Sequence, residues 1–322
     1  MNLFANLFSN PIMGIGGVLF CFIVGNLSLS LFKDKLPRDG GRNFAFNGKV
    51  TAGRPRGAGV IIILVFLVGC LLFVPYRLEN LLYYLMVLCG MLSGYLDDCS
   101  TTPWNEYKKG AIDLAICLAT AGTFLNFNPQ LTALSVFGFQ IQLHPVLFLL
   151  LATAGLWVSI NATNCSDGVD GLCGTLTCVT LAFIAFWGSA NGMDSNILAM
   201  TLLMIVSILP YLWRNAEPCQ MMMGDAGSRA FGLFIGIAIL KTGNVLLYFP
   251  LCVVLFLDGF LGIVKVSLAR FLKIRIMKNI RTPLHDHFRK NKGWSNGQTV
   301  MRFAIIQIVV SLLVLMASNT SL

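Results

Sequence analysis

Residues 57–75 read GAGVIIILVFLVGCLLFVP, and this stretch decides the fold class. It contains no charged residue, and it has about the length, roughly 20 residues, that an α-helix needs to cross the hydrocarbon core of a bilayer. The whole chain shares this character, because 56% of its 322 residues are hydrophobic, 11% are charged and the mean hydropathy is +0.76. A soluble domain carries about a quarter charged residues. The composition therefore predicts an integral membrane protein and excludes soluble, disordered and fibrous classes.

The same pattern recurs along the chain and predicts an all-α polytopic membrane protein that forms a single membrane domain over residues 1–322. The ten expected spans are 11–32, 57–75, 80–96, 109–127, 144–162, 169–189, 195–213, 227–240, 243–270 and 300–317. The ninth is too long for one straight crossing, and Gly259 and Gly262 are expected to bend or break it. The uncharged stretch 128–143 is expected to form a short hairpin around Gly138.

The basic residues give the orientation. Lys and Arg total 23 against 14 Asp and Glu, a net charge of +9. With loop 33–56 in the cytoplasm, only Arg77 and Lys241 fall outside and Lys265 falls within the ninth span, which leaves 20 of the 23 on the cytoplasmic side. This asymmetry follows the positive-inside rule and predicts that both termini lie outside. It explains the positive charge without a nucleic-acid partner.

Four polar segments interrupt the apolar pattern, and all are expected on the cytoplasmic side. The first, 94–98 (GYLDD), ends with the carboxylates Asp97 and Asp98, which suit a divalent cation or a general base. The second, 161–171 (NATNCSDGVDG), repeats amide and carboxylate side chains that can bind a nucleobase, a sugar or a hydrated metal. The alternative interpretations are a solvated helix end and an Asx-rich turn.

The third segment, 223–228 (MGDAGS), is a glycine-rich helix start that suits a phosphate group. Asp225 within it is either the helix cap or a Mg²⁺ ligand. The fourth, 281–294 (RTPLHDHFRKNKGW), combines two histidines with many cations and indicates a phosphate clamp, or a loop that only sets topology. Ten cysteines without a C-x-x-C pair are interpreted as small buried hydrophobic residues.

Further charged residues outside these segments are candidates for contacts. Arg54 and Arg56, in GRPRGAG (53–59), are candidate phosphate contacts. Lys109 is expected to pair with Asp113, four residues later on the same helix. Asp258 and Lys265 lie on one face of the ninth span and are expected to pair or to line a cavity. Carboxylates, amides, cations and histidines on one membrane face fit Mg²⁺-dependent phosphoryl transfer.

The four segments in this order resemble the polyprenyl-phosphate N-acetylhexosamine-1-phosphate transferase superfamily, and PLHDHF (283–288) favours its phospho-N-acetylmuramoyl-pentapeptide transferase branch. The resemblance covers essentially the whole chain. It implies transfer of phospho-MurNAc-pentapeptide from UDP-MurNAc-pentapeptide to undecaprenyl phosphate, giving lipid I and UMP in peptidoglycan synthesis. It also implies Mg²⁺ as the cofactor, a multi-pass protein of the bacterial plasma membrane and an active site that faces the cytoplasm.

The resemblance also implies roles for single residues. Asp225 would be the main Mg²⁺ ligand, and Asp98 would be the base that acts on the lipid phosphate. The expected catalytic residues are Asp97, Asp98, Asp225 and His285. The expected substrate-binding residues are Lys109, Asn161, Asn164, Asp167, Gly168, Asp170, Asn215, Met222 and His287. Two departures stand out, because Asp286 replaces the middle histidine of a family triplet and GRPRGAG replaces the usual first-loop motif GTPTMGG.

Other functions remain open from the sequence. A sister UDP-GlcNAc:polyprenyl-phosphate GlcNAc-1-phosphate transferase would use the same metal chemistry. An ion-coupled transporter would place acids near the bilayer midplane and show internal repeats, which the sequence lacks. A lipid-binding scaffold would leave the clustered aspartates unexplained. A direct attack and a two-step route through an aspartyl-phosphate are both compatible with the residues, and the oligomeric state is not fixed, a homodimer being one candidate.

Overall fold

The computed structural model describes residues 11–41, 52–100, 104–136 and 139–319. Its elements, in chain order, are α1 Pro11–Phe32, η1 Lys33–Lys35, α2 Ala58–Phe73, α3 Leu78–Asp98, α4 Glu106–Phe127, η2 Pro129–Leu131, β1 Ala133–Val136, β2 Phe139–Gln142, α5 Pro145–Cys165, α6 Leu172–Ala190, α7 Ser195–Asn215, α8 Asp225–Lys241, η3 Val245–Leu247, α9 Tyr248–Leu251, α10 Val253–Phe271, α11 Leu284–Lys292 and α12 Asn296–Asn319. Each of the ten expected spans corresponds to a helix or, for the ninth, to a pair of helices.

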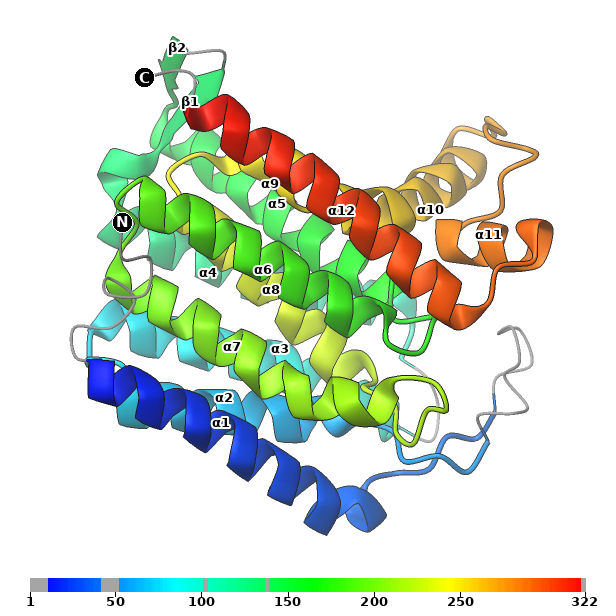
Figure 1. Ribbon diagram of the computed structural model, residues 1–322. Helices are drawn as coiled ribbons and strands as arrows, with labels where there is room; N and C mark the ends of the chain where they lie inside the picture. Colours follow the sequence, from blue (N-terminus) through cyan, green and yellow to red (C-terminus); the bar gives the residue numbers. More distant parts are fainter. Residues whose placement is uncertain (1–10, 42–51, 101–103, 137–138, 320–322) are drawn as a thin grey trace.

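The helices form a bundle whose two ends differ (Figure 1). Strands β1 and β2 pair antiparallel with Ala133 opposite Gln142, which confirms the expected hairpin, although Gly138 itself lies outside the described residues. Helix α1 begins and α12 ends at the end of the bundle that carries this hairpin, called here the hairpin end (Figure 1). The first described helix thus begins, and the last one ends, at the same end of the bundle, as the expected topology with both termini on one side requires.

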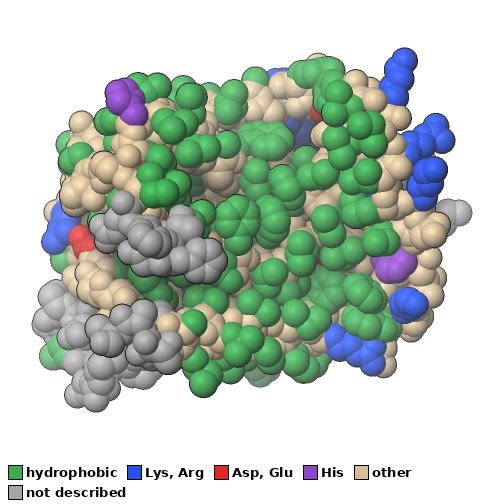
Figure 2. Space-filling view, turned by 90° about the horizontal axis from the view of Figure 1, so that it is seen from above, with side chains coloured by type: hydrophobic (Ala, Val, Ile, Leu, Met, Phe, Trp, Pro, Cys, Tyr) green, Lys and Arg blue, Asp and Glu red, His purple; other side chains and the backbone are tan. Residues whose placement is uncertain are grey.

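The surface of the bundle is that of a membrane protein. Within the described residues, six helices are long and apolar enough to cross a membrane, and the pair α9–α10 counts as a seventh span. Figure 2 shows a broad hydrophobic surface over the middle of the molecule, while most of the visible Lys and Arg side chains gather at the end opposite the hairpin. This distribution matches a bundle that lies across a bilayer with its basic end in water.

Helix α8 is the centre of the bundle. It packs against α2, α3, α4, α5, α6 and α7, and every residue from Ala226 to Lys241 is buried. Small residues let its neighbours approach: a Cβ atom on Gly59 of α2 would lie 2.2 Å from the backbone nitrogen of Gly227, and one on Gly232 would lie 2.6 Å from the Cα of Ile160. Since lipid does not drive helices together, such close backbone packing is a main source of association in membranes.

The ninth span is broken, as expected, but at a different residue. Helices α9 and α10 are bent by 93° at Cys252, so the prediction that Gly259 or Gly262 makes the break is wrong. Gln307 of α12 supports the break, because its Nε2 donates to the carbonyl of Leu251 (2.9 Å) and its Oε1 accepts from the N–H of Val254 (3.0 Å). A buried amide thus satisfies backbone groups that a break in a membrane helix would leave unpaired.

Candidate active site

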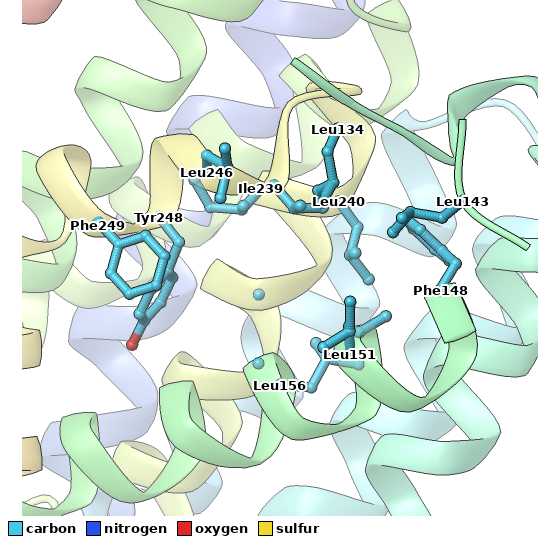
Figure 3. A pocket seen from close by; sticks show the side chains of 14 residues that line it. Leu134, Leu143, Phe148, Leu151, Leu156, Ile239, Leu240, Leu246, Tyr248 and Phe249 are labelled. Carbon is cyan, nitrogen blue, oxygen red and sulfur yellow. The ribbon is translucent and has the colours of Figure 1, made fainter. Parts of the chain in front are cut away.

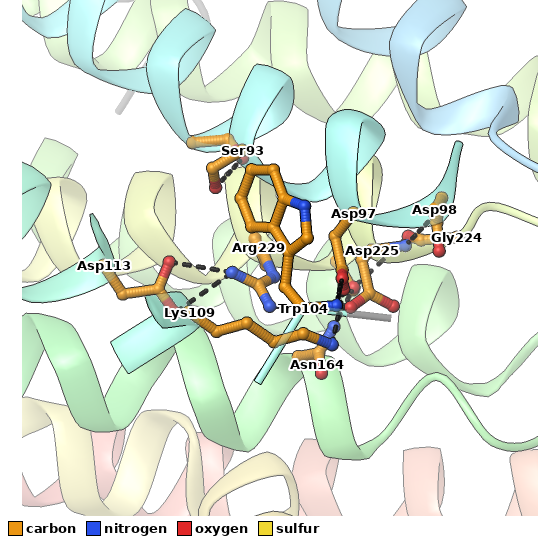
Figure 4. Close-up of polar contacts among 12 residues, drawn as sticks. Ser93, Asp97, Asp98, Trp104, Lys109, Asp113, Asn164, Gly224, Asp225 and Arg229 are labelled. Atoms are coloured by element: carbon orange, nitrogen blue, oxygen red, sulfur yellow. Dashed lines mark hydrogen bonds and ion pairs between the residues drawn. The ribbon is translucent and has the colours of Figure 1, made fainter. Parts of the chain in front are cut away.

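The site forms where α3 ends and α8 begins, at the end of the bundle opposite the hairpin (Figure 1), and Figure 4 shows its polar contacts from close by. Asp98 is the last residue of α3, and its Oδ2 accepts a hydrogen bond of 2.7 Å from the backbone N–H of Asp225, the first residue of α8. The two helix ends meet this closely because Gly94 has no side chain: a Cβ there would lie 2.3 Å from the carbonyl oxygen of Asp225. A carboxylate at a helix N-terminus is favoured by the helix dipole.

Arg56 connects these two carboxylates. Its Nη2 lies 2.7 Å from Oδ1 of Asp98 and 3.5 Å from Oδ1 of Asp225, and its Nη1 lies 3.5 Å from Asp39. The loop that carries Arg56 is fixed by backbone pairing with Met222, whose N–H donates to the carbonyl of Pro55 (2.8 Å). One guanidinium therefore serves three carboxylates.

Arg56 keeps its positive charge in this position. Burial by itself lowers the pKa of Arg56, but the surrounding carboxylates, chiefly Asp98 and Asp225, together raise it above its ordinary value. The side chain of Arg56 is 13% exposed and that of Asp225 is 19% exposed. Arg56 and Asp225 thus lie at the surface where α3 ends and α8 begins, within reach of a ligand.

The other acids at this helix junction form ion pairs that differ from those predicted from the sequence. Lys109 binds Oδ2 of Asp97 with its Nζ at 2.5 Å, so the expected pairing of Lys109 with Asp113 is wrong. Asp113 instead holds Arg229 of α8, with Nη1 2.9 Å from Oδ1 and 3.2 Å from Oδ2. The other nitrogen of Arg229, Nη2, lies 3.6 Å from Oδ2 of Asp225. Asp225 is therefore placed between two guanidinium groups. We call Asp97, Asp98, Asp113 and Asp225 the carboxylate cluster.

The segment 161–171 runs from the end of α5 to the start of α6 beside this cluster. Asn164 donates from Nδ2 to the hydroxyl of Ser228 (2.9 Å) in the first turn of α8, and Oδ2 of Asp170 lies 3.6 Å from Arg54. Asn161 faces its own helix, since Nδ2 donates to the carbonyl of Trp157. These contacts place most of the segment against the same helix junction.

Asn215 supports this segment from the end of α7. Its Oδ1 accepts from the N–H of Gly171 (2.6 Å), and its Nδ2 donates to the carbonyl of Met221 (2.9 Å). Gly171 has φ of 82°, a conformation that favours glycine. Asn215 thus ties the 161–171 segment to the loop before α8.

The histidine segment reaches the site from the other side. His285 is buried, and Nδ1 lies 2.8 Å from Oδ2 of Asp258, whose Oδ1 accepts from the backbone N–H of His285 (2.8 Å). This carboxylate partner fixes the orientation of the imidazole ring. Its Nε2 faces Gly168, where a Cβ would approach it to 2.4 Å. Arg289 donates to the carbonyl of Gly168 at 3.4 Å.

The side chains of Lys265 and His287 bond to backbone groups of the segment that precedes α11. Asp258 does not pair with Lys265 as expected, because Lys265 donates instead to the carbonyl of Ile280 (2.6 Å). His287 lies on the same helix as His285, but its Nδ1 accepts from the backbone N–H of Arg281 (3.3 Å). Of the two histidines, only His285 joins the 161–171 segment.

The sequence analysis missed two of the residues that shape the site. Arg229 was not considered, although its spacing of four residues after Asp225 places both on one face of α8. The role of Asp258 in holding His285 was also missed, because no local pattern connects residues 27 positions apart. Of the predicted site residues, Asp97, Asp98, Lys109, Asn164, Asp170, Asn215 and Asp225 are joined by contacts at this helix junction or to the segments beside it, whereas Asn161 and His287 make their contacts elsewhere.

The donor set around Asp225 suits Mg²⁺. Asp98 and Asp225 offer carboxylate oxygens, while no three His, Cys, Asp or Glu side chains in the described parts of the chain are close enough together to hold a metal by themselves. Magnesium is often held by one or two carboxylates together with phosphate oxygens of a substrate. The two aspartates therefore fit a Mg²⁺ ion that a phosphate-bearing ligand completes.

Comparison with known proteins identifies the family. The family model described as glycosyl transferase family 4 matches residues 80–243. A phospho-N-acetylmuramoyl-pentapeptide-transferase of Treponema pallidum is 38% identical over 290 residues, covering 84% of this chain and 80% of its own. The chain belongs to the phospho-N-acetylmuramoyl-pentapeptide transferase family.

More distant members of the phospho-N-acetylmuramoyl-pentapeptide transferase family agree. The protein of that name from a Wolbachia strain of Drosophila simulans is 30% identical over 268 residues, or 80% of this chain and 82% of its own. The one from Bartonella quintana is 29% identical over 323 residues, or 92% of this chain and 88% of its own. As a family member, the chain is an enzyme, a multi-pass membrane phosphoglycosyl transferase of peptidoglycan synthesis.

Proposed function

We propose that this transferase moves phospho-MurNAc-pentapeptide from UDP-MurNAc-pentapeptide to undecaprenyl phosphate, giving lipid I and UMP. The observation that carries the proposal is the meeting of Asp98 and Asp225 at one helix junction, with arginine and lysine side chains beside them. Adjacent carboxylates and cations suit a reaction in which both substrates carry phosphate. Positioning and charge neutralisation supply most of the catalysis in such transfers.

Asp98 would act on the acceptor. Both of its oxygens have partners in the free protein, Oδ2 the N–H of Asp225 and Oδ1 the guanidinium of Arg56, so Asp98 would take a proton from undecaprenyl phosphate once Arg56 has moved away. An oxygen of that phosphate then attacks the phosphorus bonded to the sugar, the bond from that phosphorus to the oxygen of UMP breaks, and UMP leaves with the electron pair. Lys109, whose Nζ reaches Asp97, would keep the negative charges of this helix junction in balance.

Asp225, with Asp98, would hold Mg²⁺. The ion, when bound, would neutralise charge on the diphosphate and on the departing UMP. The arginines of the first loop would serve the same phosphates, since Arg56 already lies beside both aspartates and Arg54 lies beside Asp170. Asn164, Asp167, Gly168 and Asp170 would receive the uridine, with His285 at their side.

The lipid tail would use the apolar part of the bundle. A cavity of about 290 Å³ lies near the break of the ninth span, lined by side chains such as Phe148, Leu156, Leu240, Leu246 and Tyr248 (Figure 3). Leu134 and Leu143 beside the hairpin also line it, so the far part of an isoprenoid chain whose phosphate lies at the opposite end of the bundle would reach it.

The orientation follows from charge. With the site end in the cytoplasm of a bacterial cell and the hairpin end outside, the basic residues obey the positive-inside rule and the soluble nucleotide substrate reaches Asp225 directly. A homodimer, if it forms, would join copies through the lipid-facing surface.

The test is UMP release by the purified protein with Mg²⁺ and undecaprenyl phosphate. UDP-MurNAc-pentapeptide is expected to give UMP and lipid I, whereas UDP-GlcNAc is expected to give none. Release with UDP-GlcNAc alone would assign the chain to the sister GlcNAc-1-phosphate reaction. Release with neither substrate, from protein with a cooperative thermal transition, would contradict the proposed reaction.

A further inference from the structure

We propose that Arg56 is an internal counter-ion that occupies the space between Asp98 and Asp225 until a nucleotide diphosphate draws its guanidinium away, so that metal binding and nucleotide binding are coupled. The inference rests on the proposed metal-assisted transfer and deepens it. It concerns a residue in the GRPRGAG segment, which carries two arginines, Arg54 and Arg56.

The contacts of Arg56 place its guanidinium where a divalent cation would bind. One guanidinium nitrogen, Nη2, lies 2.7 Å from Asp98 and 3.5 Å from Asp225, so it bridges the two oxygens that a divalent cation would share. Its Nε is buried and has no hydrogen-bond partner among the described residues, a property that the Nε of Arg229 shares. A buried N–H without a partner costs free energy, and a phosphate oxygen would satisfy it.

Arg229 shows what a fixed arginine looks like at the same aspartate. Its side chain is 6% exposed, and both oxygens of Asp113 hold its Nη1. It lies within α8, whereas Arg56 precedes α2 on an extended loop and is 13% exposed. Arg56 can therefore turn toward a ligand, while Arg229 stays with Asp113.

The coupling follows from charge. A guanidinium and a divalent cation between the same carboxylates repel each other, so Arg56 weakens metal binding to the free enzyme. A diphosphate offers Arg56 a bidentate partner and supplies further oxygen ligands to the metal. Each ligand then strengthens the binding of the other by the same factor, as thermodynamic linkage requires.

The test measures binding with Mn²⁺ as the metal probe and UDP as the nucleotide probe, on the full chain in detergent. Free Mn²⁺ is read by electron paramagnetic resonance. Without nucleotide, Arg56→Met is expected to bind Mn²⁺ about tenfold more tightly than the wild type. Without metal, the same variant is expected to bind UDP more weakly. The factor by which UDP tightens Mn²⁺ binding is expected to be larger in the wild type.

Matched variants make the result specific. Arg54→Met removes a cation from the same loop that lies beside Asp170 instead, and it is expected to leave Mn²⁺ affinity without nucleotide unchanged. Arg56→Lys keeps the charge but cannot bridge two carboxylates, and an intermediate Mn²⁺ affinity is expected. If Arg56→Met does not fold, Arg56→Lys alone tests the inference.

Unchanged or weaker Mn²⁺ binding in Arg56→Met and Arg56→Lys would overturn the inference, as would the absence of Mn²⁺ binding in every variant. Equal tightening by Arg54→Met would overturn it too, because the effect would then be one of general charge. Lipid I formation by the wild type in the same preparation separates this failure from failure of the proposed function.

Discussion

Helices α3 and α8 run antiparallel and carry a polar cluster at each end, and the two clusters are built on opposite rules. At the hairpin end, Glu79 accepts from Tyr83 (2.9 Å), from Asn128 (2.6 Å) and from Lys241 (2.9 Å), and Lys241 also donates to Asn128 (2.7 Å). One acid meets one cation, and neutral groups complete the hydrogen bonding. A cluster of this kind fixes two helices and has no remaining demand for a ligand.

The carboxylate cluster at the other end is rich in acids. Asp39, Asp98 and Asp225 share Arg56, and Asp225 lies 3.5 Å or more from each of its two arginines. Its side chain is also more exposed than that of Lys241, 19% against 4%. The difference shows that buried charge on a membrane helix has two uses: a balanced set holds the fold, and an unbalanced set invites a cation or a phosphate.

The largest expected effect comes from the unbalanced end. Asp225→Asn should lower lipid I formation at least roughly 10³-fold, since it removes the proposed main metal ligand. The thermal midpoint in detergent should stay the same or rise, because one of several crowded carboxylates is gone. Asp98→Asn should lower activity similarly without loss of stability, because its amide oxygen can still accept a hydrogen bond from the backbone N–H of Asp225. Near-normal turnover in either variant would sink the assigned role.

The balanced end should respond in the opposite way. Lys241→Met should destabilise the protein by about 3 kcal/mol, because it leaves Glu79 buried without its cation. The activity of the folded fraction should stay within about twofold of the wild type, as for substitutions away from a site. Thermal unfolding in detergent and UMP release measure the two effects.

A double variant sharpens the comparison at the hairpin end. Glu79→Gln combined with Lys241→Met should be less destabilised than Lys241→Met alone, since no unpaired charge remains. If the double variant is the less stable one, the stabilisation comes from packing and not from charge balance.

The pair Asp258–His285 tests whether a third buried charge stabilises the fold or serves the reaction. Asp258→Asn should lower activity roughly 10- to 100-fold, because it frees the orientation of His285, as when the partner of a metal-bound histidine is lost. His285→Ala should lose at least as much, and the double variant should lose little more. Additive losses would mean that the two residues act separately.

The smallest effect concerns Asn215, for which the sequence predicts substrate contact. Asn215→Ala should cost about 1 kcal/mol of stability, because it removes the hydrogen bond to the start of α6. The KM for the nucleotide substrate should rise with it only modestly, as the 161–171 segment loosens. A large rise in KM at unchanged thermal stability would instead favour direct contact with the substrate.

The sequence predicted the features that depend on composition or on local order along the chain. Apolar stretches of fixed length gave the helices of the bundle, the uncharged 128–143 stretch gave the hairpin, and acids at span ends gave the corner of Asp98 and Asp225. These signals are local, because a helix must satisfy its own backbone in a bilayer.

The features that the sequence analysis got wrong depend on contacts between distant segments. Lys109 was assigned to Asp113 by helical spacing, but Asp97 at the end of α3 lies nearer to it. The ninth span was expected to break at a glycine, but Gly259 is used for packing against Ala162, and the break at Cys252 is tolerated because Gln307 of α12 supports it. Neither partner is visible from the segment itself.

The contacts of Gly94 with Asp225 and of Gly59 with Gly227 have a consequence for how such an enzyme can change. The positions of the two aspartates are set by backbone touching backbone, so they do not depend on the side chains of the surrounding loops. The residues of the surrounding loops, Arg54 and Arg56 among them, can therefore change without moving the acids. The same contacts make the glycines themselves nearly unreplaceable, because any side chain there would push the two helices apart.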